Sequence, residues 1–178
     1  MSRLFGPIRQ NGYVVRNLKQ AMHHWIDVLG VGPFFYIERL PVRQLQFRDT
    51  PSDATISVAL AQSGELQIEL IQQLDDAPTA FREFLDAGRE GLHHVAFWTT
   101  TFDADLHRAR SGGLRVVQSG RSGRGGPDER FVYFEPGGHP GAMIELSEVS
   151  GDKGRVFRAV AAAAEGWDGR DPIREMVS

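Results

Sequence analysis

The chain has 178 residues, a formal net charge of −3 and no cysteine. This length suits one domain with a sizeable core. The absence of cysteine excludes disulfides, thiolate metal sites and cysteine nucleophiles, so any metal must be held by nitrogen and oxygen ligands. Acidic and basic residues are interspersed, which argues against nucleic acid and an anionic membrane as partners. No apolar run reaches the roughly 20 residues of a transmembrane helix, and we expect a cytoplasmic protein that binds a small molecule.

The first part of the chain predicts a strand, a helix and then further strands. Alternating residues favour a strand over 8–15, and an amphipathic helix follows that Asn17 caps and Gly30 ends. The strands expected after this helix cover 32–37, 45–48, 55–62 and 66–72, with a loop over 49–54 and a hairpin turn at Ser63-Gly64.

After a connector over 75–90 that contains a short helix, the same order begins again. We expect a strand over 91–99, a helix over 102–111 and strands over 114–118, 129–135 and 142–148. A strand, a helix and three strands therefore occur twice. This repeat predicts an α+β fold of two βαβββ modules, about 7–74 and 91–148, whose curved mixed sheets surround a shared metal-binding cleft.

The C-terminal residues lie outside this repeat. The expected domain covers 5–149, and 150–178 forms a helical tail. A helix is favoured over 153–165, and Asp171-Pro172 can cap a further short helical turn. We expect the tail to pack on the domain or on a second subunit and to carry no chemistry.

Four polar side chains occupy matching positions in the two halves. Gln10 and His94 lie in the opening strands, and Glu69 and Glu145 lie between aliphatic residues in the final strands. A buried carboxylate needs a partner, and a divalent cation would neutralise two carboxylates beside a neutral amide and imidazole. We therefore predict Gln10, Glu69, His94 and Glu145 as metal ligands. The alternative, in which buried arginines pair with both glutamates, stays open.

Two further features bear on the site. Strict alternation along 91–99 turns only one of His93 and His94 inward. The glycine-rich stretch 120–126 carries Arg121 and Arg124, which could bind a phosphate group, although a loop without a ligand is the favoured interpretation because no helix follows it.

The repeat, the run Gly91-Leu92-His93-His94-Val95-Ala96-Phe97 and the ending Gly141-Ala142-Met143-Ile144-Glu145-Leu146 resemble the vicinal oxygen chelate superfamily. This group contains glyoxalases, bleomycin-resistance proteins and extradiol dioxygenases. The resemblance covers about 7–148 and is nearest to methylmalonyl-CoA epimerases and glyoxalase-like proteins. The ligand positions of the superfamily fall on Gln10, Glu69, His94 and Glu145, a set that also resembles the zinc form of glyoxalase I.

The sequence departs from these relatives at several positions. The acid that epimerases carry on a middle strand of the first half has no counterpart in 55–60, and the glutathione-binding arginines of glyoxalase I correspond to Val14 and Glu90. Gln10 stands where an iron dioxygenase would need a second histidine.

Residues and resemblance together predict an enzyme that depends on a divalent metal ion, Zn²⁺, Ni²⁺, Co²⁺ or Mn²⁺. It would move a proton next to a carbonyl, as an isomerase, epimerase or lyase, with Glu145 and its counterpart Glu69 as general base and acid. The alternative is a non-catalytic protein that sequesters a small molecule, as bleomycin-resistance proteins do, and a weaker third possibility is a module of a larger complex. The resemblance also implies a homodimer.

Overall fold

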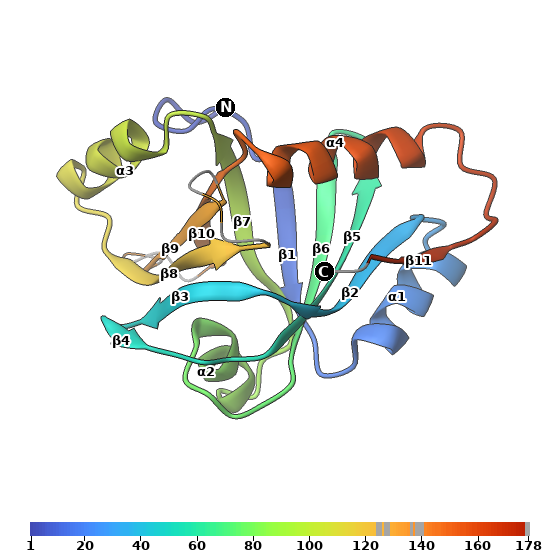
Figure 1. Cartoon of the computed structure of the whole chain (residues 1–178), viewed down its shortest axis with the longest axis horizontal. Helices are drawn as coiled ribbons and strands as arrows, with labels where there is room; N and C mark the ends of the chain where they lie inside the picture. Colours follow the sequence, from blue (N-terminus) through green and yellow to red (C-terminus); the bar gives the residue numbers. More distant parts are fainter. Residues whose placement is uncertain (124–125, 127–128, 136, 138–140, 177–178) are drawn as a thin grey trace.

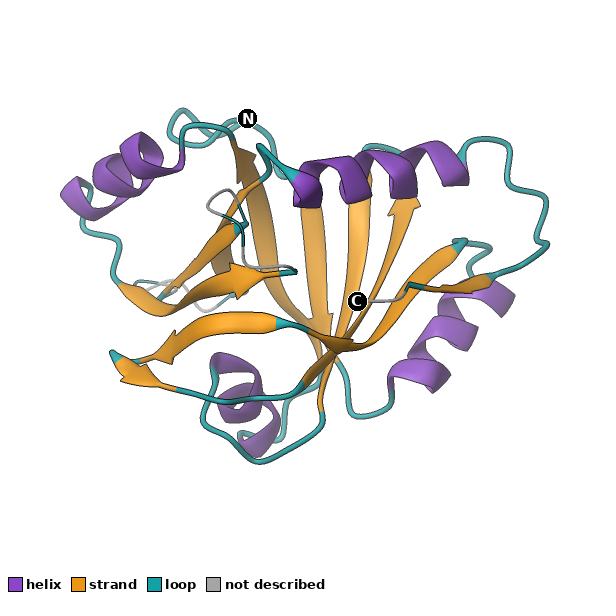
Figure 2. Cartoon of the chain, in the orientation of Figure 1, coloured by secondary structure: helices purple, strands orange, loops and turns teal. Residues whose placement is uncertain are grey.

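The computed structural model describes residues 1–123, 126, 129–135, 137 and 141–176 (Figure 1). Across these residues the strands join into one continuous mixed sheet of eleven strands. The helices lie at its periphery, and the interior is built of strands (Figure 2). No helix in this described part of the chain is both long enough and apolar enough to span a bilayer.

The elements follow the predicted order. The first half contains β1 (Gln10–Val14), α1 (Leu18–Asp27), β2 (Phe34–Leu40), β3 (Val42–Phe47), β4 (Thr50–Pro51), β5 (Ile56–Ser63) and β6 (Leu66–Gln73). The connector helix is α2 (Ala80–Asp86), and the second half contains β7 (Gly91–Thr99), α3 (Phe102–Ser111), β8 (Val116–Ser122), β9 (Arg130–Phe134) and β10 (Met143–Glu148). The chain continues into α4 (Asp152–Ala164) and β11 (Ile173–Glu175).

The duplication is visible in the strand order. One half runs β2-β5-β6-β1, and the other half runs β8-β9-β10-β7 in mirrored order, with β1 and β7 paired antiparallel between them. The pairs β1–β6 and β7–β10 are parallel, and the remaining neighbours within each half are antiparallel. The predicted α+β fold of two βαβββ modules is therefore confirmed.

Local chemistry explains how the first half orients its polar residue. The Asn17 side chain accepts a hydrogen bond from the Gln20 amide and so begins α1. The buried Ile68 and Leu70 of β6 belong to the same core cluster as residues of α1. Because side chains alternate along a strand, Glu69 between them faces the opposite side, as the sequence predicted.

The stretch expected as a loop over 49–54 contains a strand. Thr50–Pro51 pairs with the end of β3, and β3 itself pairs antiparallel with β8 of the other half. Leu45 of β3 is buried in a core cluster to which both halves contribute. Burial against the second half, which sequence pattern does not report, therefore holds this hairpin in place.

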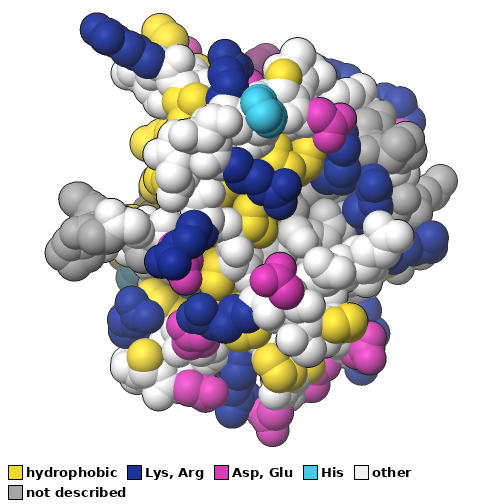
Figure 3. Space-filling model, turned by 90° about the vertical axis from the view of Figure 1, so that its left-hand side faces the viewer, with side chains coloured by type: hydrophobic (Ala, Val, Ile, Leu, Met, Phe, Trp, Pro, Cys, Tyr) yellow, Lys and Arg dark blue, Asp and Glu magenta, His cyan; other side chains and the backbone are white. Residues whose placement is uncertain are grey.

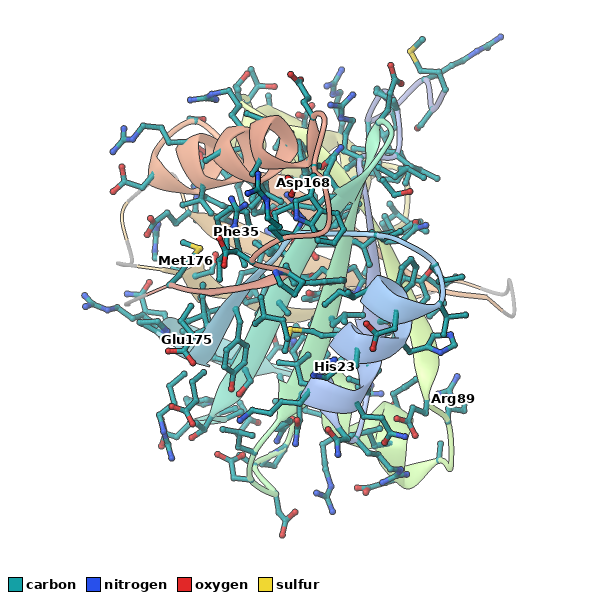
Figure 4. All side chains as sticks on the ribbon, turned by 90° about the vertical axis from the view of Figure 1, so that its right-hand side faces the viewer. His23, Phe35, Arg89, Asp168, Glu175 and Met176 are labelled. Carbon is teal, nitrogen blue, oxygen red and sulfur yellow. The ribbon has the colours of Figure 1, made fainter. Side chains whose placement is uncertain are left out.

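The C-terminal segment also differs from the prediction. The short helical turn expected after Asp171-Pro172 is wrong, because Ile173–Glu175 forms β11 and pairs parallel with β2, which would otherwise be an edge strand. The helix α4 packs against β5, and its Phe157 and Val160 are buried in the core. Beyond β11, the Met176 amide donates to the Tyr36 carbonyl, and Figure 4 shows Met176 close to Phe35 of β2.

Candidate metal centre and cleft

Strand register gives the two halves the same arrangement of polar residues. In the first half, Gly12 lies opposite Glu69, and Gln10 lies two residues earlier on β1. In the second half, Ala96 lies opposite Glu145, and His94 lies two residues earlier on β7. The positions matched from sequence are therefore equivalent in space.

Three of the four predicted residues meet directly. His94 Nε2 lies 3.0 Å from Glu145 Oε2 and 3.3 Å from Glu69 Oε2. The His94 side chain is fully buried, and the side chains of Glu145 and Glu69 are 6% and 15% exposed. Within the described chain neither glutamate pairs with an arginine, so the alternative of buried Arg–Glu pairs is wrong for these residues.

The atoms at this meeting point lack ordinary hydrogen bonds. His94 Nε2 and Glu145 Oε2 are buried, and neither makes a hydrogen bond of acceptable geometry within the described residues, although the two atoms are close. Separations near 3 Å are those of neighbouring donors bound at about 2.1 Å to one ion. One imidazole nitrogen and two carboxylate oxygens suit Zn²⁺, Ni²⁺, Co²⁺ or Mn²⁺. Glu69, His94 and Glu145 could thus hold a divalent metal.

Gln10 lines the same cavity as both glutamates and is 1% exposed. Its Nε2 donates to Gln67 Oε1 over 2.7 Å. This bond fixes the side-chain amide, and the Gln10 Oε1 atom makes no hydrogen bond with another residue of the described chain. That oxygen is therefore available as a fourth donor.

Gly12 provides the space that the His94 ring occupies. A Cβ atom at position 12 would lie 1.8 Å from Cε1 of His94. Real Cβ atoms do not approach other atoms so closely, so only glycine fits at this point of β1. This role of Gly12 was not predicted from the sequence, although a glycine inside a predicted strand is a signal of close approach.

Both histidines of the pair are buried, which corrects the prediction that only one points inward. Gly12 pairs with His94 while Tyr13 pairs with Leu92, so His93 is an extra residue in the ladder. Such a bulge breaks the alternation of side chains. His93 Nδ1 lies 3.2 Å from His94 Nδ1, and His93 Nε2 lies 3.3 Å from the Ala80 carbonyl oxygen. Burial and the neighbouring His94 lower the pKa of His93 to about 3.

The pKa values of the three converging groups move in different directions. Burial lowers the pKa of His94, but the close contact and negative charge of Glu145 and Glu69 outweigh it and raise the value to about 9. Burial and the charge of Glu145 raise the pKa of Glu69 despite its contact with His94. Burial also acts to raise the pKa of Glu145, but His94, Lys153 and Tyr133 outweigh it and lower the value. The environment therefore moves the pKa values of two chemically identical carboxyl groups in opposite directions.

Glu69 and Glu145 of the triad Glu69, His94 and Glu145 line a cavity of about 410 Å³. Aliphatic and aromatic side chains such as Ile56, Val58 and Phe131 form most of its walls. Tyr133 of β9 lies against the His94 ring, with ring centroids 4.9 Å apart, and burial beside the two glutamates raises its pKa well above the usual range. The shape suits a small ligand whose body is apolar and whose polar atoms reach the triad.

The C-terminal segment, expected to carry no chemistry, contributes Lys153 to this cavity. Lys153 Nζ donates to the Arg130 carbonyl and to Ser147 Oγ, each over 3.1 Å. Burial lowers the pKa of Lys153 to about 8, although Glu145 and Glu69 act to raise it. The only sequence signal was composition, because lysine occurs at just two positions, 19 and 153, beside 18 arginines.

The proposed phosphate-binding arginines do not gain support. Arg124 lies outside the described residues. Arg121 donates to Gln44 Oε1 and to the Gly126 carbonyl. On the face seen in Figure 3, basic and acidic side chains are mixed around apolar surface.

A duplicated βαβββ sheet in which an imidazole and carboxylates converge from both halves defines the vicinal oxygen chelate architecture. The sequence profile of the Glyoxalase/Bleomycin resistance protein/Dioxygenase superfamily matches residues 9–134, and the chain belongs to this superfamily.

Individual relatives agree with this assignment. An uncharacterised protein of Bacillus subtilis (strain 168), YqjC, is 26% identical over 144 residues, which span 80% of this chain and 91% of that protein. Methylmalonyl-CoA epimerase from Mycobacterium tuberculosis has a similar fold, with a TM-score of 0.58 and 23% identity over 87% of this chain and 95% of the epimerase. The hypothetical protein BH1468 from Bacillus halodurans C-125 has a TM-score of 0.59 and 17% identity, covering 82% of this chain and 96% of its own. At these identities the solved structures establish the fold alone.

Proposed function

We propose that the chain is a divalent-metal-dependent enzyme that moves a proton next to a carbonyl group, as an isomerase, epimerase or lyase on a small carbonyl or acyl-thioester substrate. The metal ligands in this proposal are Gln10, Glu69, His94 and Glu145. The observation that carries it is the convergence of His94 Nε2 with two carboxylate oxygens, two of these buried atoms lacking any hydrogen bond in the described chain. The superfamily supports it further, because it includes epimerases and isomerases.

In this proposal the two glutamates have different roles in proton transfer. A bound divalent ion would polarise the carbonyl oxygen and so make the neighbouring carbon more acidic. Glu145 is the base that accepts the proton, and Glu69, its counterpart in the first half, is the acid that returns it. Each carboxylate has two oxygens, so one can take part in proton transfer while the other stays bound.

The experiment has two stages. Native-purified protein is analysed for bound Zn, Ni, Co and Mn and titrated with each ion. A panel of hydroxy ketones and acyl thioesters is then incubated in D₂O with the metal-loaded protein, and deuterium incorporation next to the carbonyl is followed by NMR.

The expected result is metal-dependent exchange by the wild type and by Glu65→Gln, an exposed control in the β5–β6 turn, and its loss in Glu145→Gln. General acid–base catalysis is worth about 10² to 10⁴ in rate, so the loss should be at least hundredfold. Protein that contains no metal and binds none on titration would overturn the proposal.

A second candidate, a non-catalytic small-molecule-binding protein, is favoured by one observation. The strand segment that would carry an epimerase acid presents only the apolar residues Ile56, Val58 and Leu60 to the cavity. Ser57 alternates to the opposite face of the strand, where its hydroxyl donates to the Glu38 carbonyl. A binding protein of this kind should hold an apolar ligand equally well after chelation of metal and should catalyse no exchange.

The expected homodimer is tested in the same preparation by light scattering.

A further inference from the structure

Lys153 lies in the first turn of α4 and lines the cavity beside the two glutamates. Its ammonium group donates to two neutral acceptors, the Arg130 carbonyl and Ser147 Oγ. An ammonium has three N–H donors. In the described part of the chain the third makes no hydrogen bond, the ammonium lies over the Phe131 ring at 5.9 Å from its centroid, and no carboxylate lies within ion-pair distance. Lys153 is therefore a cation in the cleft that lacks a counter-ion in contact.

The position of Lys153 relative to the triad follows from β10. Ser147 lies two residues after Glu145, and side chains two apart on a strand share a face, about 6.5 to 7 Å from one another. Both Ser147 and Glu145 are buried, and both line the cavity together with Lys153. The ammonium thus lies beside the meeting point of Glu145, His94 and Glu69, along the same wall.

The charges around Lys153 change when a metal binds. Glu145 and Glu69 are its strongest favourable electrostatic partners, and a divalent ion would neutralise this pair. Of the other acids that line the cavity, Glu129 accepts a hydrogen bond from the Gly126 amide, and Asp152 pairs with Arg155. In the metal-bound protein the ammonium would therefore lose the compensation of its two strongest partners and keep that of Glu129 and of Glu148, which is already paired with Arg130. A cation in that position is stabilised by an anion that contacts it.

We propose that Lys153 forms an anion subsite and that the substrate is a small oxo acid with an apolar body, its carbonyl at the triad and its carboxylate on Lys153. This inference rests on the proposed function, since it names the substrate class of the same cleft. Arg155 also lines the cavity but pairs with Asp152. The one remaining positive charge on Lys153, among the described lining residues, favours a monoanionic carboxylate over a phosphate dianion. The apolar walls then contact the hydrocarbon part of the acid.

A binding experiment tests the subsite with 4-methyl-2-oxopentanoate and its methyl ester as probes. Zinc-loaded wild type, Lys153→Met and the control Lys19→Met, which removes the same charge from an exposed position on α1, are titrated with both compounds by calorimetry. We expect wild type and Lys19→Met to prefer the acid over the ester. In Lys153→Met this preference should fall at least about tenfold, as expected for the loss of a charge-assisted hydrogen bond.

An independent measurement uses the small number of lysines and needs no variant to fold. In protein labelled with ¹³C,¹⁵N-lysine only positions 19 and 153 give signals. Adding the acid should shift the Lys153 signal and leave the Lys19 signal unchanged, and the ester should shift neither.

The outcomes separate the two proposals. If zinc binds but the acid preference is the same in wild type and Lys153→Met, or the Lys153 signal does not respond to the acid, the subsite is wrong and the metal enzyme stands. If no zinc binds to wild type, the proposed function fails, and the inference fails with it.

Discussion

The two halves of the sheet have the same strand order but treat one pair of positions differently. His94 in the second half lies opposite Gly12, whereas its equivalent in the first half, Gln10, lies opposite Ala96. The imidazole fits because its partner has no side chain, since a Cβ on Gly12 would lie 1.8 Å from the ring. In the first half, the Gln10 side chain has no ring and lies opposite Ala96, which does carry a methyl group.

This difference shows how a symmetric fold forms an asymmetric site. Duplication gives each half one carboxylate at an equivalent place, Glu69 and Glu145. Only the second half supplies a nitrogen donor, and the first half supplies the space for it. Substitutions that make the two halves alike, or that increase their difference, test this explanation.

The largest effect is expected from His94→Gln, which gives both halves the same amide. Loss of the imidazole nitrogen should weaken zinc binding by at least about 100-fold, beyond the usual cost of losing an outer-shell partner. Isothermal titration measures it. His23→Gln is the control, because His23 lies on the exposed face of α1 beside Asp27 (Figure 4). Equal zinc affinity in His94→Gln and wild type would contradict the assignment.

The next effect comes from Gly12→Ala, which removes the space in the first half. The added methyl group collides with the His94 ring, and overpacking of this kind costs about 3 kcal/mol at the upper end of its usual range. Urea unfolding measures the loss of free energy, and zinc titration should show weaker binding because the ring is displaced. Gly112→Ala serves as a comparison, since the backbone φ there is −81° and a methyl group would meet only the Ala109 and Arg108 carbonyl oxygens at an ordinary 3.4 Å. A fully stable Gly12→Ala protein with normal zinc affinity would show that the ring is not held there.

The pH dependence of metal binding above pH 7 should come from His94 of the second half, because Gln10, its counterpart in the first half, cannot titrate. In the metal-free protein the pKa of His94 is raised to about 9, so the ring is protonated at pH 7 and must lose that proton to bind zinc. Apparent affinity should therefore rise about tenfold per pH unit up to about pH 9. Calorimetry in two buffers of different ionisation enthalpy should detect about one proton released. An affinity that stays constant between pH 7 and 8.5 would refute this.

The smallest effect is a coupling between Gln10→His and Ala96→Gly. Histidine at position 10 should be overpacked against Ala96, and glycine at 96 should relieve the clash, as Gly12 does for His94. A double-mutant cycle on unfolding free energy should give a favourable coupling of about 1 kcal/mol. If the two substitutions change the unfolding free energy additively, a glycine opposite the histidine ring is not what allows the ring to fit.

Sequence pattern predicted the features that depend on local periodicity and on the repeat. Glu69 and Glu145 could be assigned to the inner face because aliphatic residues alternate with them on strands. Gln10 and His94 could be matched because each opens a module. These are properties of a single strand or of the order of elements.

Features that depend on contacts between distant segments were missed. The bulge at His93 exists only in the pairing of β1 with β7, so alternation along one strand could not reveal that both histidines are buried. The β3–β4 hairpin and β11 are strands because they lie next to β8 and β2. Lys153 enters the cleft because α4 packs against β5, which no local pattern encodes.

The most direct test of the account is a crystal structure of zinc-soaked protein with anomalous data collected at the zinc edge. We expect one strong peak bonded at about 2.0 to 2.2 Å by His94 Nε2, Glu69 and Glu145, with Gln10 Oε1 as the fourth protein ligand. Anomalous maps without a peak between the two glutamates, or with zinc held only by exposed residues elsewhere, would contradict it.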